Sequence, residues 1–435
     1  MERIKNKCKW ISSHSSISNV SVVLLCTLIA IFNTPIVSRN VPNIILIGLM
    51  VTFAVSIFPR VFCLEKEEGI ALLLLSLYMV IITAYKLLGI SSAALYYYFN
   101  IVQYYFFFAA IMMVYKSLTR RQIIIILMVA IGTAVITIIS NIYLCLTSAS
   151  ANEYVNLYKT HRYTTNATNT QFATAMLLLA GVSFIGALNR KKRIPQMAMY
   201  ALCVLCMYFA AAVAQRLTVV ILAFLMFPLL LLANVDIEQR RKISGRMKML
   251  LIVAALVVVG LCVFYKPILQ WIGAVIGSPR VSKRINQIIV LLETGNFVEA
   301  GGSLGVRYEL MMTSWKTFTA TLSNFFLGIG DHRADNMVIG NHSLVLDELA
   351  RYGLVFAILS FWLILYSFKV VRKIVGVQPG TRVDKQVLVL FVILILRAVV
   401  GALFDVSIGI VLFVVTPLLL RLETNNCDAD ESRAF

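Results

Sequence analysis

The sequence predicts an all-α integral membrane protein, a bundle of about twelve transmembrane helices. Three observations predict this fold class. Of the 435 residues, 60% are hydrophobic and only 14% are charged, which leaves too little polar surface for a water-soluble domain. The apolar residues form runs long enough to cross about 30 Å of hydrocarbon, which takes about 20 residues of helix. The basic residues gather in alternate loops between those runs.

Each apolar run is predicted to be a helix, because a continuous apolar segment in lipid must satisfy its own backbone hydrogen bonds. The first run lacks a small-residue cleavage site and is followed by further runs, so it is predicted to be a retained helix. In chain order the runs cover residues 17–37, 41–59, 69–90, 92–115, 122–147, 171–189, 195–214, 217–234, 249–272, 349–368, 386–404 and 406–420.

The basic loops predict the orientation. Lys and Arg cluster before the first run and in the loops 116–121, 190–193, 240–248 and 369–385. Because these residues accumulate on the cytoplasmic side of membrane proteins, the loops and both termini are predicted to be cytoplasmic. The net charge of +19 is then explained by the Lys and Arg residues of the cytoplasmic loops. No nucleic-acid motif accompanies it, so nucleic acid is not expected as a partner.

Two predicted outer segments are long, residues 148–170 and 273–346. The second is the large outer loop of what is otherwise a single membrane domain over residues 1–435, and loops of this length are usually functional. Within it, residues 283–297 are amphipathic. They form either a helix on the membrane surface or a helix that packs over the bundle.

Cations on the outer side are informative because topology does not explain them. Arg216 lies in a predicted tight turn between two spans, and Arg307 begins "RYELMMTSW" in the large loop, after Arg280 and Arg284. Lys86 ends a span at the outer face. Such side chains either serve an anion or play structural roles: Arg216 and Lys86 could snorkel to the headgroups, and Arg307 could be an ordinary residue of a helix face.

His342 and Arg397 are the other notable polar residues. His342 stands in "NHSLVLDELARYGL", where an apolar helix meets the outer surface. A lone histidine is more often structural, but this one shares its side of the membrane with the outer arginines. Arg397 lies within a predicted span and is expected to face the bundle interior, with an ion pair to Asp405 as one option. The aromatic runs 96–100 and 104–108 are interpreted as packing residues, with lipid or sugar contact as the alternative.

The outer side carries no acidic cluster that would hold a divalent cation. The first outer loop, "NTPIVSRNVPN", has no carboxylate, and no DxD or HExxH pattern occurs on that side. Guanidinium groups can neutralise phosphate oxygens instead, because they remain charged and bind two oxygens at once. An outer site with arginines, one histidine and no metal ligands therefore predicts chemistry on a diphosphate, with no metal and no cofactor.

Three local patterns resemble the O-antigen polymerase and O-antigen ligase superfamily of bacterial surface-polysaccharide assembly. "AQRLTVV" resembles the family's arginine before a late span, although Gln215 stands where relatives often have a small hydroxyl residue. "SLGVRYELMMTSWKTF" followed by "NFFLGIGDHR" resembles an Arg…Trp helix and a Gly-x-Gly turn. "NHSLVLDELARYGL" resembles a histidine helix with a glycine about ten residues on. The layout of spans, termini and large periplasmic loop is similar over most of the chain.

The resemblance implies a glycosyltransferase C-like bundle in the bacterial inner membrane. Its activity would be metal-independent transfer of a glycan from undecaprenyl diphosphate. Arg216 and Arg307 would bind the diphosphate, while His342 would act on the acceptor hydroxyl or steady the leaving group. The further substrate-binding candidates are Lys86, Gln215, Arg280 and Arg284. Implied partners are the lipid-linked oligosaccharide, the bilayer, a chain-length regulator and a flippase.

The wording "HSxxxD" and the closing "SIGIVLFVVTPLLL" look more like the polymerase branch, which joins repeat units of O-antigen or capsule type. The nearest alternative is a ligase that uses the same donor and a lipid A core acceptor. A flippase or transporter is the alternative of another class, although the two halves of the chain show no internal repeat. A non-catalytic assembly scaffold is the remaining alternative.

Overall fold

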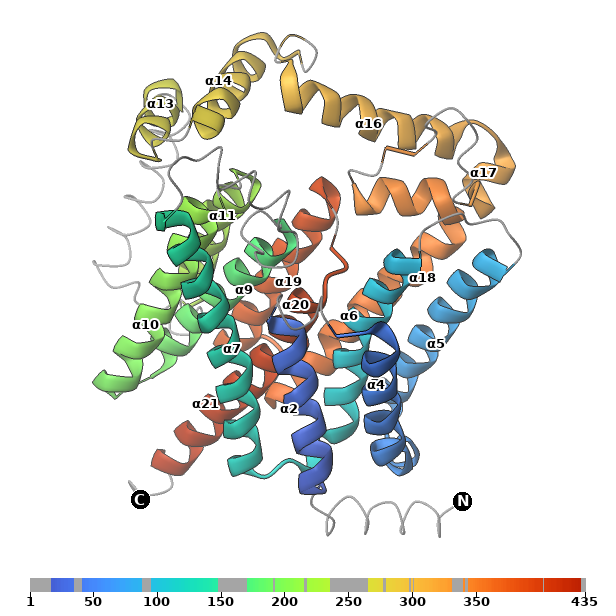
Figure 1. Ribbon diagram of the computed structural model, residues 1–435, viewed down its shortest axis with the longest axis vertical. Helices are drawn as coiled ribbons and strands as arrows, with labels where there is room; N and C mark the ends of the chain where they lie inside the picture. The colour runs from blue at the N-terminus through green and yellow to red at the C-terminus, as the bar shows by residue number, and fades with distance from the viewer. Residues whose placement is uncertain are drawn as a thin grey trace.

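The computed structural model describes most of the chain and is helical throughout the described part (Figure 1). No strand occurs among these residues, so the all-α prediction is confirmed for them. The described residues are 17–34, 41–87, 95–147, 170–190, 192–214, 217–234, 265–276, 279–296, 299, 301–330, 339–340, 343–401 and 403–431.

Every predicted apolar run except 249–272 coincides with a described helix of the bundle. Only residues 265–272 of the exception are described, and they belong to α13 (Tyr265–Ile276). The bundle helices are α2 (Asn19–Asn33), α4 (Asn43–Ile57) with a 3₁₀ turn (Phe58–Cys63), α5 (Lys66–Leu87), α6 (Leu95–Val114), α7 (Arg120–Thr147), α9 (Thr170–Asn189), α10 (Arg193–Tyr208) with a π turn (Phe209–Val213), α11 (Leu217–Ala233), α18 (Leu344–Val375), α19 (Arg382–Val400), α20 (Val406–Gly409), a π segment (Ile410–Val415) and α21 (Thr416–Glu431).

Six of the described helices are long and apolar enough to cross a membrane. They cover Asn43–Cys63, Lys66–Tyr85, Arg120–Tyr143, Gln171–Asn189, Leu344–Val375 and Val406–Thr424. Helices Asn19–Asn33 and Thr218–Ala233 are apolar but shorter. The protein is therefore a helical membrane protein, and the count of twelve spans stays a prediction.

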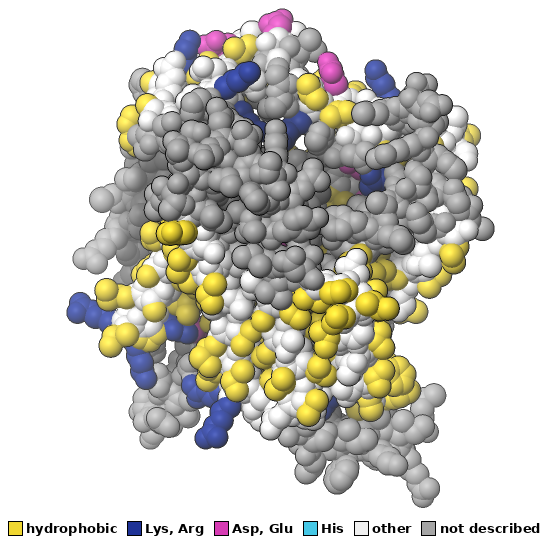
Figure 2. Space-filling model, in the orientation of Figure 1, with side chains coloured by type: hydrophobic (Ala, Val, Ile, Leu, Met, Phe, Trp, Pro, Cys, Tyr) yellow, Lys and Arg dark blue, Asp and Glu magenta, His cyan; other side chains and the backbone are white. Residues whose placement is uncertain are grey.

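The outer faces of the bundle are apolar. Large side chains such as Val80, Met128 and Phe361 are 62%, 61% and 56% exposed on three different helices. Figure 2 shows hydrophobic side chains spread over the face of the bundle that is in view, with Lys and Arg side chains nearer the two ends of the molecule. Lipid covers such a surface without the cost that water would impose.

The centre of the bundle is formed by α9, the π segment and α21, whose side chains within the membrane are almost all buried. Helix α6 packs on this centre with Tyr104, Tyr105, Phe107 and Phe108, all of which are buried. Tyr104 contacts the ring of Phe413 at 5.2 Å between centroids, edge to face. The packing interpretation of the aromatic run 104–108 is thus confirmed.

The long helices alternate in direction, so the loops divide between two ends (Figure 1). At one end, Ile17 N donates to Ser117 O at 3.3 Å and Arg421 donates to Tyr115 O at 2.7 Å. We call this the basic end, because the described residues of the basic loops 116–121, 190–193 and 369–385 all lie there. The start of α2 and the end of α21 lie there too. Which side of the membrane it faces stays a prediction.

The opposite end carries the cap, which we define as the four helices α13 (Tyr265–Ile276), α14 (Pro279–Thr294), α16 (Gly302–Thr319) and α17 (Leu322–Leu327) (Figure 1). Ile285 and Ile289 of α14 are buried against Leu269 of α13. Lys266 Nζ lies 2.7 Å from Glu293 Oε1 across the same pair. The amphipathic segment predicted at 283–297 therefore covers its apolar face with a neighbouring cap helix.

Candidate functional site

Helix α18 is broken at its cap end. Gly353 has φ +75° and ψ −178°, a backbone conformation that costs other residues much more than glycine. The helical segment 344–352 ends at this break, so its last carbonyl groups lack the N–H donors that a further helical turn would supply. Ile329 N and Gly330 N donate to the carbonyls of Ala350 and Arg351 at 3.0 and 2.8 Å. The Gly-x-Gly turn after α17 thus satisfies the backbone at the break.

The two backbones at this joint lie in direct contact. A Cβ atom added to Gly328 would lie 2.2 Å from Arg351 O, and one added to Gly353 would lie 2.3 Å from the carbonyl carbon of Phe326. Both positions also have positive φ. Only glycine fits either side, so "NFFLGIG" and "ELARYGL", separate patterns in the sequence, form one interlocked unit.

A buried carboxylate, Asp347, joins α16 to the start of α18. Ser314 Oγ donates to Asp347 Oδ1 at 2.6 Å, and Ser343 N donates to Asp347 Oδ2 at 3.1 Å. Gly340 N donates to Ser314 Oγ at 2.9 Å. Ser343 is also the N-cap of α18, since its Oγ accepts from Leu346 N. Asp347 therefore links the helix that carries Arg307 to the segment that leads into α18.

The cap end of α5 belongs to the same unit. Tyr85 Oη donates to Leu327 O at 2.6 Å, and its ring meets that of Tyr352 at 5.1 Å, edge to face. Next to this contact, Glu348 and Arg351 are both buried, with Arg351 Nη1 3.8 Å from Glu348 Oε1. Each charge of this pair within α18 lowers the cost of burying the other.

Four of the basic residues predicted to belong to the site lie on helices at the cap end. Arg307 is half-buried on α16 and shares a helix face with Ser314, seven residues on. Arg284 is half-buried on α14, which packs against α16. Lys86 and Arg280 lie in the last turn of α5 and the first turn of α14. Their side chains are not among those described.

The other predicted site residues, Gln215, Arg216 and His342, lie outside the described residues. Leu217, which follows Arg216, begins α11, and Ser343, which follows His342, caps α18. Both helices begin at the cap end (Figure 1). Helix α11 packs on α19, and Leu344 N of α18 donates to the carbonyl of Gly401 just after α19, at 3.4 Å.

Arg397 faces the bundle interior, as predicted. It is only 3% exposed, and its Nε donates to Thr174 Oγ1 on α9 at 3.0 Å. Gly401 leaves room for it, because a Cβ atom there would lie 2.0 Å from Arg397 Nη1. Asp405 caps α20 by accepting from Ser407 N at 2.9 Å. An Arg397–Asp405 ion pair stays a prediction.

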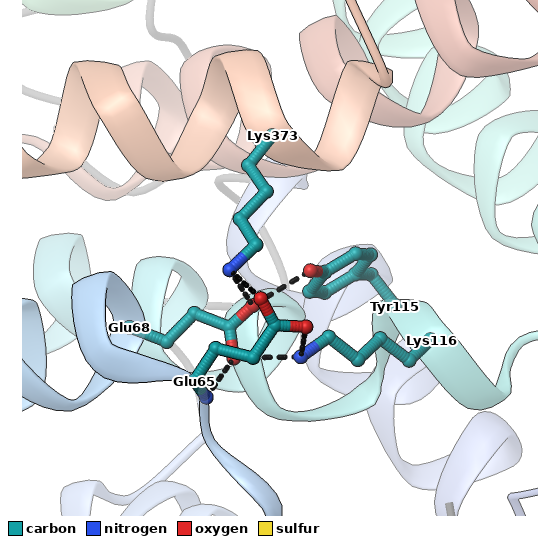
Figure 3. A network of polar contacts seen from close by, with 5 residues as sticks. All are labelled: Glu65, Glu68, Tyr115, Lys116 and Lys373. Carbon is teal, nitrogen blue, oxygen red and sulfur yellow. Dashed lines mark hydrogen bonds and ion pairs between the residues drawn. The ribbon is translucent and has the colours of Figure 1, made fainter. Parts of the chain in front are cut away.

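Sequence reasoning missed a polar cluster at the opposite end of the bundle (Figure 3). We call it the basic-end cluster: Glu65, Glu68, Tyr115, Lys116 and Lys373. Glu68 is fully buried and accepts from Tyr115 Oη at 2.6 Å, Lys116 Nζ at 2.9 Å and Glu65 N at 2.9 Å. Lys373 Nζ lies 3.3 Å from Glu68 Oε1, and both lysines also contact Glu65.

The cluster ties the start of α5 to the end of α6 and to the end of α18. Hydrogen bonds from Lys116 and Lys373 lower the pKa of Glu65 to about 2. Burial and the bond to Glu68 raise the pKa of Tyr115. The sequence offered a signal, since two glutamates precede an apolar run in a chain with few acidic residues. The lysines were explained as topological charges, and their partners lie far away in the sequence.

No protein-family model and no curated protein sequence matches this chain. The resemblance to the polymerase and ligase superfamily therefore rests on the three sequence patterns and the layout of the chain. Two of those patterns lie wholly or largely within the described residues, and they meet in the interlocked unit at the cap end.

Proposed function

We propose that the protein polymerises lipid-linked polysaccharide repeat units of O-antigen or capsule type. In this proposal a growing glycan moves from undecaprenyl diphosphate to the end sugar of another lipid-linked unit. The bundle is then glycosyltransferase C-like, with twelve spans in the bacterial inner membrane. Both termini are cytoplasmic and the cap faces the periplasm.

The observation that best supports the proposal is the junction of distant segments at the cap end. The Arg307 helix, the Gly-x-Gly turn and the start of α18 are held together by Ser314, Asp347 and the paired glycines. These segments carry two of the three patterns of the family resemblance. Such a rigid junction suits a site that must hold charged groups in fixed positions around a substrate.

The proposed chemistry assigns charge stabilisation to the arginines. As the sugar carbon leaves the diphosphate, negative charge grows on the bridging oxygen, and guanidinium donors from Arg216 and Arg307 neutralise it. His342 takes the proton from the acceptor hydroxyl, since an imidazole titrates near neutral pH. Lys86, Gln215, Arg280 and Arg284 hold the rest of the lipid-linked substrate in this proposal.

The test is elongation of a lipid diphosphate-linked repeat unit by the purified protein. We expect Arg307→Lys to lose most of the activity, about a hundredfold, because a point charge cannot replace a two-pronged donor. Arg121→Lys, at the exposed start of α7, is the matched control and should elongate normally. Near-normal elongation by Arg307→Lys at equal abundance would exclude the diphosphate role. Full activity is expected in excess chelator, and inhibition relieved by magnesium would contradict the metal-free mechanism.

A strain that lacks the protein separates the polymerase from its closest alternative. On a gel of surface polysaccharide, a polymerase defect leaves one repeat unit attached and removes the ladder. A ligase defect removes every unit. Transport without any elongation by the purified protein would instead favour the flippase.

A further inference from the structure

A hollow lies at the basic end, between the 3₁₀ turn after α4, the start of α5 and the end of α6. Its polar side is formed by Arg60, Lys116 and Ser117, and its apolar side by Leu64, Met112 and Met113. The two sides differ in kind, since one carries cations and a hydroxyl while the other carries soft hydrocarbon and thioether groups. A ligand with an anionic head and an apolar body matches this division.

The polar side belongs to a network with excess positive charge. Arg60 donates to Ser117 Oγ, and Lys116 contacts Glu65 and Glu68 at 2.8 and 2.9 Å. Glu68 also lines the hollow, but two lysines neutralise it. A guanidinium carries five N–H donors and an ammonium three, so each group can form several hydrogen bonds at once.

The same network contains two more cations. Lys373 Nζ contacts both carboxylates, and Arg421 donates to Tyr115 O and lies over the Tyr115 ring. Among the described residues, the network therefore holds four cations, Arg60, Lys116, Lys373 and Arg421, against the carboxylates of Glu65 and Glu68. An anion at the hollow meets net attraction.

The depth of the hollow matches that of lipid headgroups. Arg60 lies near the end of the span Asn43–Cys63. Phe58 and Phe62 flank it on the same turn, 58% and 67% exposed, with their rings edge to face at 6.0 Å. Exposed apolar rings on a span are covered by lipid rather than water. Arg60, which lines the hollow, therefore lies beside lipid-facing side chains where the span ends.

We propose that the mouth of this hollow binds the headgroup of an anionic glycerophospholipid from the leaflet at the basic end, since the room inside it, about 20 Å³, admits only water-sized groups. The phosphodiester oxygens accept hydrogen bonds from Arg60, Lys116 and the Ser117 hydroxyl, and the lipid body lies against Met113 and Leu64. The lipid connects the 3₁₀ turn after α4 to the basic-end cluster. This site is distinct from the proposed polymerase site and does not depend on it.

The experiment measures the lipids that stay on the purified protein by native mass spectrometry. Phosphatidylglycerol and phosphatidylcholine are compared, and inorganic phosphate serves as a soluble competitor. We expect the unmodified protein to retain phosphatidylglycerol preferentially and Arg60→Gln to retain about tenfold less, because one charge-assisted bond to phosphate is lost. Arg121→Gln, which removes an exposed cation of the same end without lining the hollow, should behave like the unmodified protein.

Three results would overturn the proposal: equal retention of the two lipids, undiminished retention by Arg60→Gln, or displacement of the lipid by inorganic phosphate alone. A second variant guards against misfolding of the first. Met113→Trp fills the apolar side of the hollow and leaves every charge in place. Loss of phosphatidylglycerol by a folded Met113→Trp protein, judged by gel filtration, supports the site, and unchanged retention counts against it.

Discussion

At the scale of single residues, Asp347 connects more segments through hydrogen bonds than its position in the sequence suggests. Its two oxygens accept from Ser314 of the cap helix α16 and from Ser343, the N-cap of α18. Asp347→Asn keeps the shape but replaces one acceptor with a donor, which leaves a buried N–H or hydroxyl without its partner. We expect a loss of roughly 1–3 kcal/mol in stability.

Thermal unfolding in detergent measures this loss, with Glu309→Gln on an exposed face of α16 as the control. An unchanged midpoint for Asp347→Asn would show that the carboxylate is not needed at this junction.

Glu65 gives the protein a predicted pH dependence at the basic end. Its pKa is about 2 in the folded protein, against an ordinary value of 4.5, because Lys116 and Lys373 stabilise the carboxylate. A lowered pKa contributes stability above about pH 4.5, and this contribution disappears as the pH falls toward 2. We expect the melting midpoint of the unmodified protein to fall over that range more than that of Glu65→Gln.

Glu67→Gln is the matched control, since Glu67 is exposed two residues away. Equal acid sensitivity in the unmodified protein and Glu65→Gln would show that this carboxylate does not couple to folding.

At the scale of elements, the break in α18 sets the shape of the cap end. Gly353→Ala forces a side chain into positive φ and against the backbone of Phe326. We expect it to lower the melting midpoint and to reduce elongation, because the Gly-x-Gly turn can no longer dock. Gly132→Ala in α7, where an added Cβ meets nothing within 4 Å, should be neutral or stabilising. Similar behaviour of the two variants would contradict the interlocked joint.

The sequence predicted the helices better than their contacts. Long apolar runs marked α4, α5 and α7 directly, since a membrane helix needs about 20 apolar residues whatever packs against it. The break in α18 was hidden inside one apolar run, because a glycine there is compatible with a straight helix. Its partner at Gly328 lies 25 residues earlier, and no periodicity connects the two. The same holds for Glu68 and Lys373.

At the scale of the whole molecule, the charge pattern predicted which loops lie at the same end of the bundle. Loops 116–121, 190–193 and 369–385 come together because alternate turns of an up-and-down bundle must. The candidate site was predicted only in part. The sequence placed Arg307 and Arg284 in one outer segment, but it could not show that α14 packs against α16, or that Asp347 ties α16 to α18.

The same charge pattern predicts the orientation of the molecule, which can be measured in intact cells. Lys316 on α16 and Lys192 before α10 are exposed and lie at opposite ends. In a variant without native cysteines, Lys316→Cys should react with a membrane-impermeant maleimide, whereas Lys192→Cys should react only after lysis. The reason is that lysine and arginine loops remain on the cytoplasmic side during insertion. Labelling of Lys192→Cys alone in intact cells would turn the cap toward the cytoplasm. A site for periplasmic polymerisation could not then lie there.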